Sequence, residues 1–264
     1  MQATAPQAFD TRLLNAGANL LFALAALAFL GLALSWLVRL PLFTLRGILI
    51  EGEVAHNSAT TIRANAAPKL AGNFFTMDLA RSQQAFESVP WVRRAVVRRV
   101  WPNRLAVALE EHKAAAYWHR EDRDDELVNS YGEVFDANLG DVEDESLPTL
   151  KGPEGSAGAM LDFYRRLLPV FGRLGARVEA LTLSTRGSWD AELDSGAEIE
   201  LGRGTPDELL ARAESFAGTV TQVTSRYQRP LEYADLRHAS GYAVKLRGVS
   251  TGAAADKQTK GARP

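Results

Sequence analysis

The chain has 264 residues, of which 46% are hydrophobic, and a formal net charge of -2. This balance is typical neither of a nucleic-acid-binding protein nor of a disordered chain. The chain has no cysteine, so it contains neither disulfides nor thiolate metal sites.

The first informative segment is an apolar run from Leu20 to Val38 that contains no charged residue. At about 1.5 Å per residue, a helix over this run spans about 28 Å, close to the hydrocarbon thickness of a bilayer. Trp36 and Arg39 are typical of the membrane interface, and Pro41 ends the helix. A signal peptide is the alternative, but its apolar region has only about 7 to 15 residues and ends at a small-x-small cleavage site. We expect an uncleaved transmembrane helix over residues 20–38.

The charges that flank this helix do not decide its orientation. Arg12 precedes it, whereas Arg39 and Arg46 follow it. The tail over residues 1–19 is too short to fold alone, so we expect the folded domains after the helix. The roughly 200 residues from Phe43 to Val249 suit two small domains.

The first of these domains reads as strand, helix, helix, strand, strand. Asn57 or Ser58 can cap the first helix, and Asp78 can cap the second. The predicted strands are Leu45–Gly52, Val92–Val100 and Leu105–Glu111, with Trp101-Pro102-Asn103 as the turn between the last two. We expect two helices on one face of a three-stranded sheet.

The second domain is predicted to be a mostly antiparallel β domain with flanking helices, which makes the whole fold α+β. The expected elements are a hairpin turn at Tyr131–Phe135, a helix over Ala157–Phe171, three strands of a meander within Leu181–Leu201, a helix from Thr205 to about Ser225, and strands over Leu231–Leu236 and Gly241–Leu246. The small and polar residues from 250 to 264 predict a disordered tail.

The sequence contains no residue pattern typical of a catalytic, metal-binding or phosphate-binding site. The four histidines, His56, His112, His119 and His238, are not spaced as in zinc sites. The acidic stretches over residues 121–126 and 141–145 do not fit an EF-hand and are interpreted as solvated loops. Gly202-Arg203-Gly204-Thr205 is interpreted as a tight turn before a helix rather than a phosphate site. We therefore expect no enzyme, no metal and no cofactor.

One basic patch stands out on the predicted strand over residues 92–100 and beyond it. It contains Arg93, Arg94, Arg98, Arg99 and Arg104. Consecutive arginines on a strand place charge on both faces of the sheet. The patch either protects an exposed sheet edge against aggregation or docks an acidic partner segment or lipid headgroups.

Several segments resemble a known family. FTLRGILIEG, NFFTMD and VPWVRRAVVRRVWPNRLAVALEEHKAAAYW resemble a POTRA domain, and a single anchor directly before this domain is similar to the FtsQ/DivIB family of bacterial cell-division proteins. Five later segments are similar to that family's successive blocks in the same order: LVNSYGEVF, LPTLKGPEGSA, RGSWDAEL, IELGRG and YADLRHASGYAV. The resemblance covers residues 20–248.

The resemblance implies a topology and a function. Residues 1–19 would be a cytoplasmic tail, and residues 20–38 would be an inner-membrane helix whose anchor residues include Leu20, Trp36 and Val38. Residues 43–112 would form a periplasmic POTRA domain and residues 113–249 a periplasmic β domain, followed by a disordered tail over residues 250–264. The protein would act at the division septum as a scaffold that binds FtsB and FtsL and so controls septal peptidoglycan synthesis. The POTRA domain would recruit other divisome proteins, with Arg93, Arg94, Arg98 and Arg99 as the possible docking patch. No nucleic acid or small-molecule substrate is expected.

The last predicted strand is the sharpest site hypothesis, because a final strand often lies at a sheet edge that can accept a partner strand. In the resembled family this edge captures FtsB. The implied contacts are His238, Ser240, Gly241, Val244 and Lys245, with Arg186 reaching from a neighbouring strand. The family often has tyrosine where this chain has His238, which can still stack and donate a hydrogen bond.

Two other classes of protein compete with this interpretation. A secretion or membrane-insertion accessory protein also uses POTRA domains, usually several of them before a β-barrel, whereas one POTRA-like segment is found here. A membrane-anchored envelope hydrolase requires a nucleophile or a metal site, and the sequence offers neither.

Overall fold

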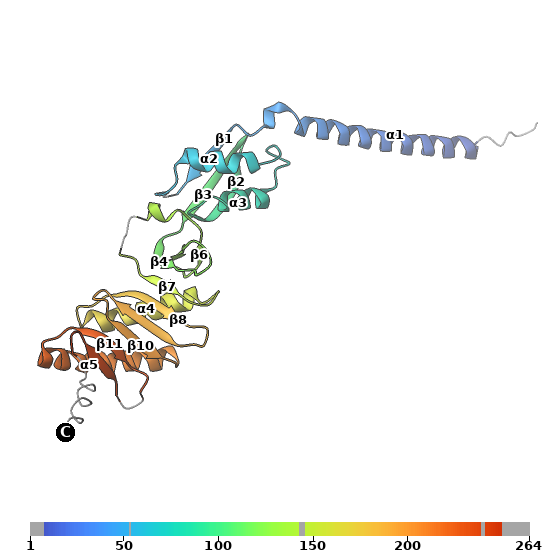
Figure 1. Ribbon diagram of the computed structural model, residues 1–264. Coiled ribbons are helices and arrows are strands. Elements are labelled where there is room, and N and C mark those ends of the chain that lie inside the picture. The colour runs from blue at the N-terminus through green and yellow to red at the C-terminus, as the bar shows by residue number, and fades with distance from the viewer. Residues whose placement is uncertain (1–7, 53, 143–145, 239–240, 250–264) are drawn as a thin grey trace, which may run out of the picture. The chain divides into compact units, whose positions relative to one another are not determined.

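The computed structural model describes residues 8–52, 54–142, 146–238 and 241–249. The chain divides into two compact units, Met1–Glu111 and His112–Pro264 (Figure 1). Each unit has its own sheet. The predicted tail over residues 250–264 lies outside the described residues, as does Ser240.

The first unit begins with the long helix α1 (Ala8–Val38). Its segment Leu14–Val38 is long and apolar enough to cross a membrane, with a mean hydropathy of 2.4, and none of it is buried against the rest of the protein. Helical structure extends N-terminal of the predicted membrane segment over residues 20–38, and it covers the described residues from Ala8 onward. The short helix η1 (Pro41–Phe43) follows directly.

The rest of the first unit confirms the predicted order of strand, helix, helix, strand and strand. Its elements are β1 (Gly47–Glu51), α2 (Ala59–Ala66), η2 (Ala67–Lys69), α3 (Leu79–Glu87), β2 (Val92–Val100) and β3 (Arg104–Glu111). The strands form a sheet of order β1-β3-β2, in which β1 is parallel and β2 antiparallel to β3. Ser58 and Asp78 cap α2 and α3 by accepting hydrogen bonds from backbone N-H groups of the first turn.

Both helices cover one face of this sheet and form its core. Ile62 of α2 and Phe86 of α3 are fully buried against Leu105 and Val107 of β3. The other face stays open, and Ala108 and Val96 are exposed there. The predicted arrangement of two helices on a three-stranded sheet is therefore confirmed.

The second unit is a nine-stranded sheet with two long helices. Its elements are β4 (Ala114–Trp118), β5 (Glu126–Asn129), β6 (Val134–Phe135), η3 (Leu139–Asp141), β7 (Thr149–Lys151), α4 (Ala157–Gly172), β8 (Val178–Leu183), β9 (Trp189–Leu193), β10 (Glu198–Gly202), α5 (Pro206–Tyr227), β11 (Leu231–Asp235) and β12 (Ala243–Leu246). The strand order is β12-β11-β10-β9-β8-β7-β4-β5-β6. Most neighbours are antiparallel, including the predicted meander β8-β9-β10.

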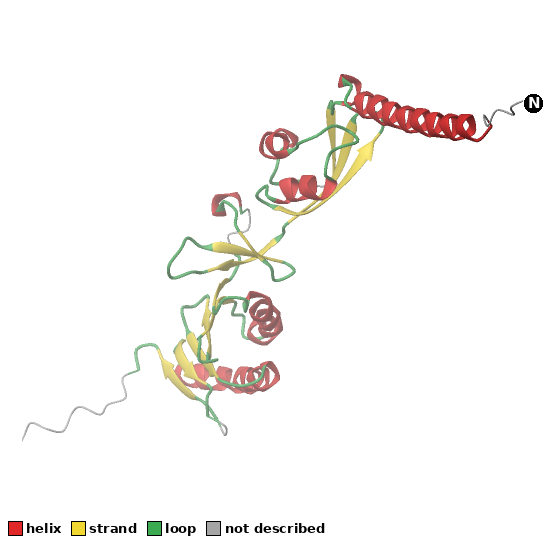
Figure 2. Ribbon diagram, turned by 90° about the vertical axis from the view of Figure 1, so that its right-hand side faces the viewer, coloured by secondary structure: helices red, strands yellow, loops and turns green. Residues whose placement is uncertain are grey.

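Two of the three parallel pairs of this sheet, β10 with β11 and β7 with β8, arise from helical connections, while the third joins β4 to β7. The helix α5 lies between β10 and β11 in the chain, and α4 lies between β7 and β8, so the strands on either side run in the same direction. Both helices cover the same face of the sheet (Figure 2), where Phe171 and Phe216 are fully buried. This packing leaves β12 at one edge of the sheet and β6 at the other.

Candidate functional site

The edge strand β12 exposes backbone groups that have no partner strand. Among the described strands it pairs with β11 alone. The N-H of Arg247 donates to the carbonyl of Pro230 at 2.9 Å, and Leu246 lies opposite Leu231. Leu246 is therefore in a non-hydrogen-bonded pair, and its own N-H and C=O point away from β11. Because the direction alternates along a strand, the N-H and C=O of Val244 point outward as well.

The side chains of this strand fix it to the helix layer. Val244 packs against the core, and Tyr242, just before the strand, places its ring on Phe216 with a centroid distance of 5.1 Å. The Tyr242 hydroxyl also lies 2.7 Å from the Thr219 hydroxyl. Lys245 is exposed and forms an ion pair with Glu232. The strand is thus fixed from one side while its outer backbone edge remains open.

The other predicted contact residues lie near the start of this strand. His238 and Gly241 are exposed and help to line a cavity of about 360 Å³ beside α5. Arg186 is exposed in the turn between β8 and β9. The expectation that it reaches from a neighbouring strand is wrong, since β10 and β11 lie between β9 and β12. Pairing of Trp189 with Gly202, and of Asp235 with Ala243, nevertheless places this turn and the start of β12 at the same end of the sheet.

A charged network ties β11 to β10 next to this edge. Arg237 donates from Nε to Asp235 Oδ1 at 2.9 Å and from Nη2 to Asp235 Oδ2 at 2.7 Å. Its Nη1 lies 2.8 Å from Glu200 Oε1, and the Tyr233 hydroxyl donates to the other oxygen of that carboxylate. The hydrogen bonds from Arg237 lower the pKa of Asp235 to about 2, and the bond to Glu200 raises the pKa of Tyr233 to about 12.

This network was not predicted from the sequence. Tyr233, Asp235 and Arg237 alternate in the sequence, and extended backbone with this spacing places side chains on the same face. Tyr233 and Asp235 lie in β11, and Arg237 follows two residues after its end. What the sequence could not supply is Glu200, which comes from the neighbouring strand β10. The network stabilises β11, the strand to which β12 is hydrogen-bonded, and so supports the candidate edge strand.

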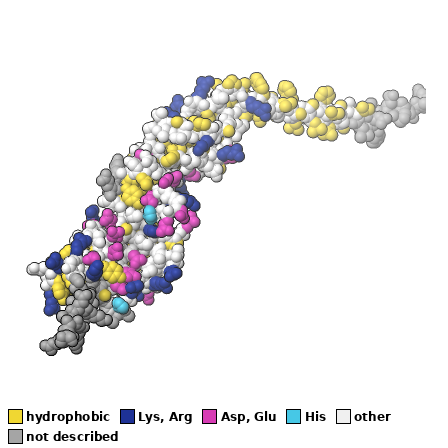
Figure 3. All heavy atoms as spheres, viewed as in Figure 1, with side chains coloured by type: hydrophobic (Ala, Val, Ile, Leu, Met, Phe, Trp, Pro, Cys, Tyr) yellow, Lys and Arg dark blue, Asp and Glu magenta, His cyan; other side chains and the backbone are white. Residues whose placement is uncertain are grey.

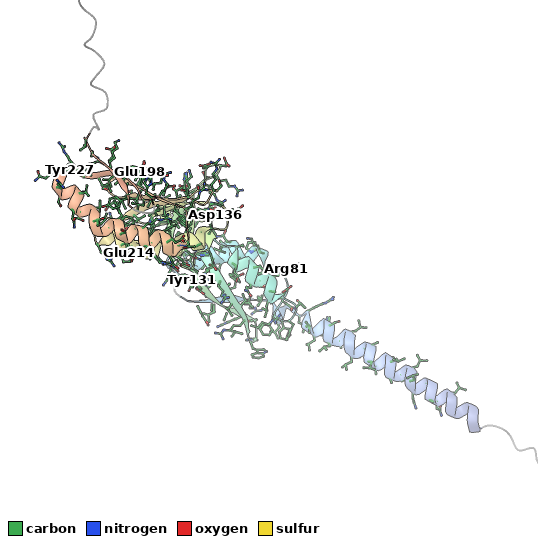
Figure 4. The ribbon with its side chains drawn as sticks, turned by 90° about the horizontal axis from the view of Figure 1, so that it is seen from below. Arg81, Tyr131, Asp136, Glu198, Glu214 and Tyr227 are labelled. Carbon is green, nitrogen blue, oxygen red and sulfur yellow. The ribbon has the colours of Figure 1, made fainter. Side chains whose placement is uncertain are left out.

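The open face of this sheet is acidic. Asp190, Glu192, Glu198 and Glu200 line a hollow of about 330 Å³ together with Tyr233. Burial raises the pKa of Asp190, and the charge of Glu200 raises it further. Figure 4 shows Glu198 on the sheet and Glu214 on the helix α5.

The basic patch of the first unit is largely engaged in internal contacts. Arg93 pairs with Glu110 at 2.9 Å, Arg98 pairs with Glu51 at 2.7 Å, and Arg99 donates to the carbonyl of Met77 at 2.6 Å. The other member of the predicted docking patch, Arg94, is exposed. Their strand β2 lies at an edge of its sheet, as the interpretation of edge protection requires. Docking through this patch stays a prediction.

Three of the four histidines contact neighbouring side chains in the structure. His56 stacks on Trp91 at a centroid distance of 3.9 Å, and His112 stacks on Phe135 at 4.1 Å. His119 lies 2.9 Å from a carboxylate oxygen of Asp125. Among the residues that the structure describes, no group of three His, Asp or Glu side chains is placed to hold a metal ion.

Comparison with known proteins assigns both units. Residues 43–112 match the family described as POTRA domain, FtsQ-type, and residues 116–237 match the family described as Cell division protein FtsQ/DivIB, C-terminal. The chain is 42% identical over 241 residues to the cell division protein FtsQ of Burkholderia pseudomallei, and the aligned residues cover 91% of this chain and 94% of the relative. It is 37% identical over 272 residues to the FtsQ of Bordetella pertussis, covering 96% and 98% of the two chains. The chain therefore belongs to the FtsQ/DivIB family of cell-division proteins.

Proposed function

We propose that this protein is a single-pass scaffold of the divisome in the inner membrane. Residues 20–38 cross the membrane, residues 1–19 lie in the cytoplasm, and the POTRA domain over 43–112 and the β domain over 113–249 lie in the periplasm at the division septum. The protein acts by binding FtsB and FtsL, and links early division proteins to septal peptidoglycan synthesis without catalysing a reaction.

The open edge of β12 supports this proposal more than any other observation. The outward N-H and C=O of Val244 and the outward N-H of Leu246 are spaced to hydrogen-bond an added strand, whereas the carbonyl of Leu246 already accepts the N-H of Val249 at 3.2 Å. The membrane-proximal segment of FtsB adds to the sheet at this edge. Each backbone hydrogen bond contributes about 0.5 to 1.5 kcal/mol, so the ladder supplies affinity and the side chains near it supply specificity.

The side chains around the edge set the chemistry of this partner segment. Arg186 has no hydrogen-bond or ion-pair partner among the described residues, so its guanidinium is available for a bidentate bond to a carboxylate of FtsB. Lys245 already pairs with Glu232, so a partner carboxylate at this position has to share or replace that pair. His238 and Gly241 complete the contact surface beside the start of the strand. Ser240, which lies outside the described residues, is also proposed to contact FtsB.

A second contact of the scaffold involves the POTRA domain. Arg94 and Arg98 are exposed and share the open face of the sheet with Val96. This surface recruits an upstream division protein through an acidic segment, with Arg93 and Arg99 holding the patch in place through their internal contacts.

A titration of the full chain in nanodiscs with the periplasmic part of FtsB from the same organism tests the proposal. Val244→Pro removes an outward N-H and is expected to weaken binding at least about tenfold. Val134→Pro is the matched control, because β6 is the opposite edge strand. The N-H of Asn129 donates to the carbonyl of Glu133, and Val134 lies opposite Val128, so the backbone of Val134 also points outward.

The two variants separate the possible outcomes. Loss of binding in Val244→Pro alone supports capture at β12. Equal binding by Val244→Pro and the unsubstituted chain contradicts the assigned edge. Equal loss in both variants attributes the effect to folding of the sheet and contradicts a specific role of this strand.

A further inference from the structure

Three segments of the first unit meet beside the C-terminal end of α1. Asn73 Nδ2 donates to the carbonyl of Val38, the last residue of the helix, at 2.6 Å. The N-H of Phe74 donates to the carbonyl of Phe43 at 3.0 Å. The N-H of Arg46 donates to the carbonyl of Asn103 at 2.9 Å, which brings the turn between β2 and β3 to the same place. This end of the domain is therefore fixed next to the membrane helix.

Large apolar side chains are exposed on each of these segments. Leu42 follows the helix and is 62% exposed, Phe75 is 47% exposed, and Trp101 at the tip of the hairpin is 76% exposed. Phe43 supports Phe75 through an edge-to-face contact with a centroid distance of 4.9 Å. We call Leu42, Phe75 and Trp101 the apolar collar. A protein surface in water rarely gathers such side chains without a partner.

The same segments carry only positive charges. Residues 39–47, 67–77 and 99–104 contain Arg39, Arg46, Lys69, Arg99 and Arg104 and no Asp or Glu. In Figure 3 dark blue and yellow side chains are seen close to the point where α1 meets the rest of the first unit. A cavity of about 630 Å³ beside β1 combines Arg46 with the apolar side chains of Leu45, Leu70 and Met77. Aromatic and cationic residues together are typical of the interface between water and membrane.

We propose that the apolar collar docks onto the headgroup layer of the bilayer that α1 spans, with Arg39, Arg46 and Arg104 binding the phosphates of anionic phospholipids. Leu42 lies four residues after Val38, so the chain cannot carry it farther than about 14 Å from the end of the helix. Leu, Phe and Trp side chains gain by entering the interface, and arginine binds phosphate bidentately. Each such cation strengthens binding to an anionic surface about fivefold.

This docking goes beyond the proposed scaffold function and does not depend on FtsB. It holds the POTRA domain at a fixed height above the membrane before any protein partner binds. It also leaves the open face of the sheet, which carries Arg94, Val96 and Arg98, available to a protein.

A fluorescent probe on the full chain tests the docking. The chain has no cysteine, so Ala71→Cys gives one labelling site on an exposed loop residue near the collar. Thr60→Cys is the control, because it lies near the start of α2, where Asn57 bonds to the carbonyl of Pro90 at the opposite end of the unit. Each labelled chain is placed in nanodiscs that contain quencher-labelled phosphatidylcholine, with or without phosphatidylglycerol.

The proposal predicts strong quenching of the Ala71 probe, stronger with phosphatidylglycerol, and little quenching of the Thr60 probe. Arg46→Glu with Arg104→Glu is expected to lower the docking constant by at least about tenfold. Leu42→Ser with Trp101→Ser tests the apolar part, and Leu49→Ser with Val96→Ser is its matched control, since these two side chains are 55% and 56% exposed on the open sheet face.

Three results would overturn the proposal. The Ala71 probe could be quenched as weakly as the Thr60 probe, which would show that the collar stays in water. Quenching independent of phosphatidylglycerol would remove the role of the arginines. An equal loss in the collar variant and in its sheet-face control would show that the effect is a general one of folding or surface polarity.

Discussion

Asp235→Asn tests the charged network that supports the edge strand. The carboxylate accepts hydrogen bonds from the backbone N-H, Nε and Nη2 of Arg237, at 3.0, 2.9 and 2.7 Å. Asparagine has nearly the same shape but no charge, so the substitution removes the ion pair without opening a cavity. We expect a lower free energy of unfolding for the second unit.

The size of the effect follows from the pKa of Asp235, which the bonds to Arg237 lower from 3.8 to about 2. One pKa unit corresponds to about 1.4 kcal/mol, which sets an upper limit of about 2.5 kcal/mol for the charged form. Arg237 is 53% exposed, and water therefore screens the pair, so we expect a loss of about 1 to 2 kcal/mol at neutral pH.

The pH dependence has a definite sign. A lowered pKa stabilises the folded state fully above about pH 4, and this stabilisation is lost as the pH falls toward about 2. The difference between the variant and the unsubstituted chain should therefore fall by about half between pH 7 and about pH 3.

Urea unfolding of the full chain in detergent, read by pulsed hydrogen exchange in peptides from β11, measures this difference. Asp162→Asn is the control, because Asp162 forms only an exposed ion pair with Arg165 on α4. An effect of Asp235→Asn that is equal at both pH values would refute the argument, as would the absence of any effect at pH 7.

Other predictions concern local stability in the second unit. Thr205→Ala removes the capping box of α5 and should cost about 1 kcal/mol in urea unfolding; an unchanged midpoint would contradict the cap. Gly132→Ala should lower the free energy of unfolding more than Gly187→Ala does in the same assay. Both glycines have positive φ, but only at position 132 would the new Cβ lie 2.6 Å from Gly158 Cα. Equal losses would contradict the close contact. Because the pKa of Tyr233 is raised to about 12, its hydrogen bond should stabilise the folded state fully below about pH 10, and this stabilisation should be lost as the pH rises through 12. Tyr233→Phe should not show this loss of stability. An ultraviolet titration in which the Tyr233 phenol ionises at its ordinary pKa would contradict the prediction.

The sequence predicted elements that have strong local signals. The bounds of β2 were predicted as Val92–Val100 and are confirmed, because the Trp101-Pro102-Asn103 turn ends the strand. The helix from Ala157 and the helix after Thr205 were also predicted near their observed bounds, since apolar spacing and caps mark them locally. The membrane segment over residues 20–38 stays a prediction, and the helix extends beyond it toward the N-terminus because hydropathy marks the membrane segment and not the whole helix.

The rest depends on pairing between distant segments. The parallel pair of β4 and β7 and the junction of β7 with β8 leave no local pattern, so the nine-stranded sheet was not foreseen. The dipeptide Arg186-Gly187 predicts that Arg186 lies in a turn. Its separation from β12 depends on the strand order of the sheet, which the local sequence does not indicate. The edge position of the last predicted strand was expected from the sequence, and among the described strands β12 does lie at an edge of the sheet.

We propose that β12 binds a strand of FtsB through its outer backbone edge. Amide hydrogen exchange at Val244 and Leu246, measured on the full chain in nanodiscs with and without saturating FtsB periplasmic segment, tests it most directly. We expect exchange at both outward N-H groups to slow at least about tenfold, while exchange at Lys245, whose N-H faces β11, changes less. Unchanged exchange at Val244 and Leu246 while FtsB is bound would contradict the claim.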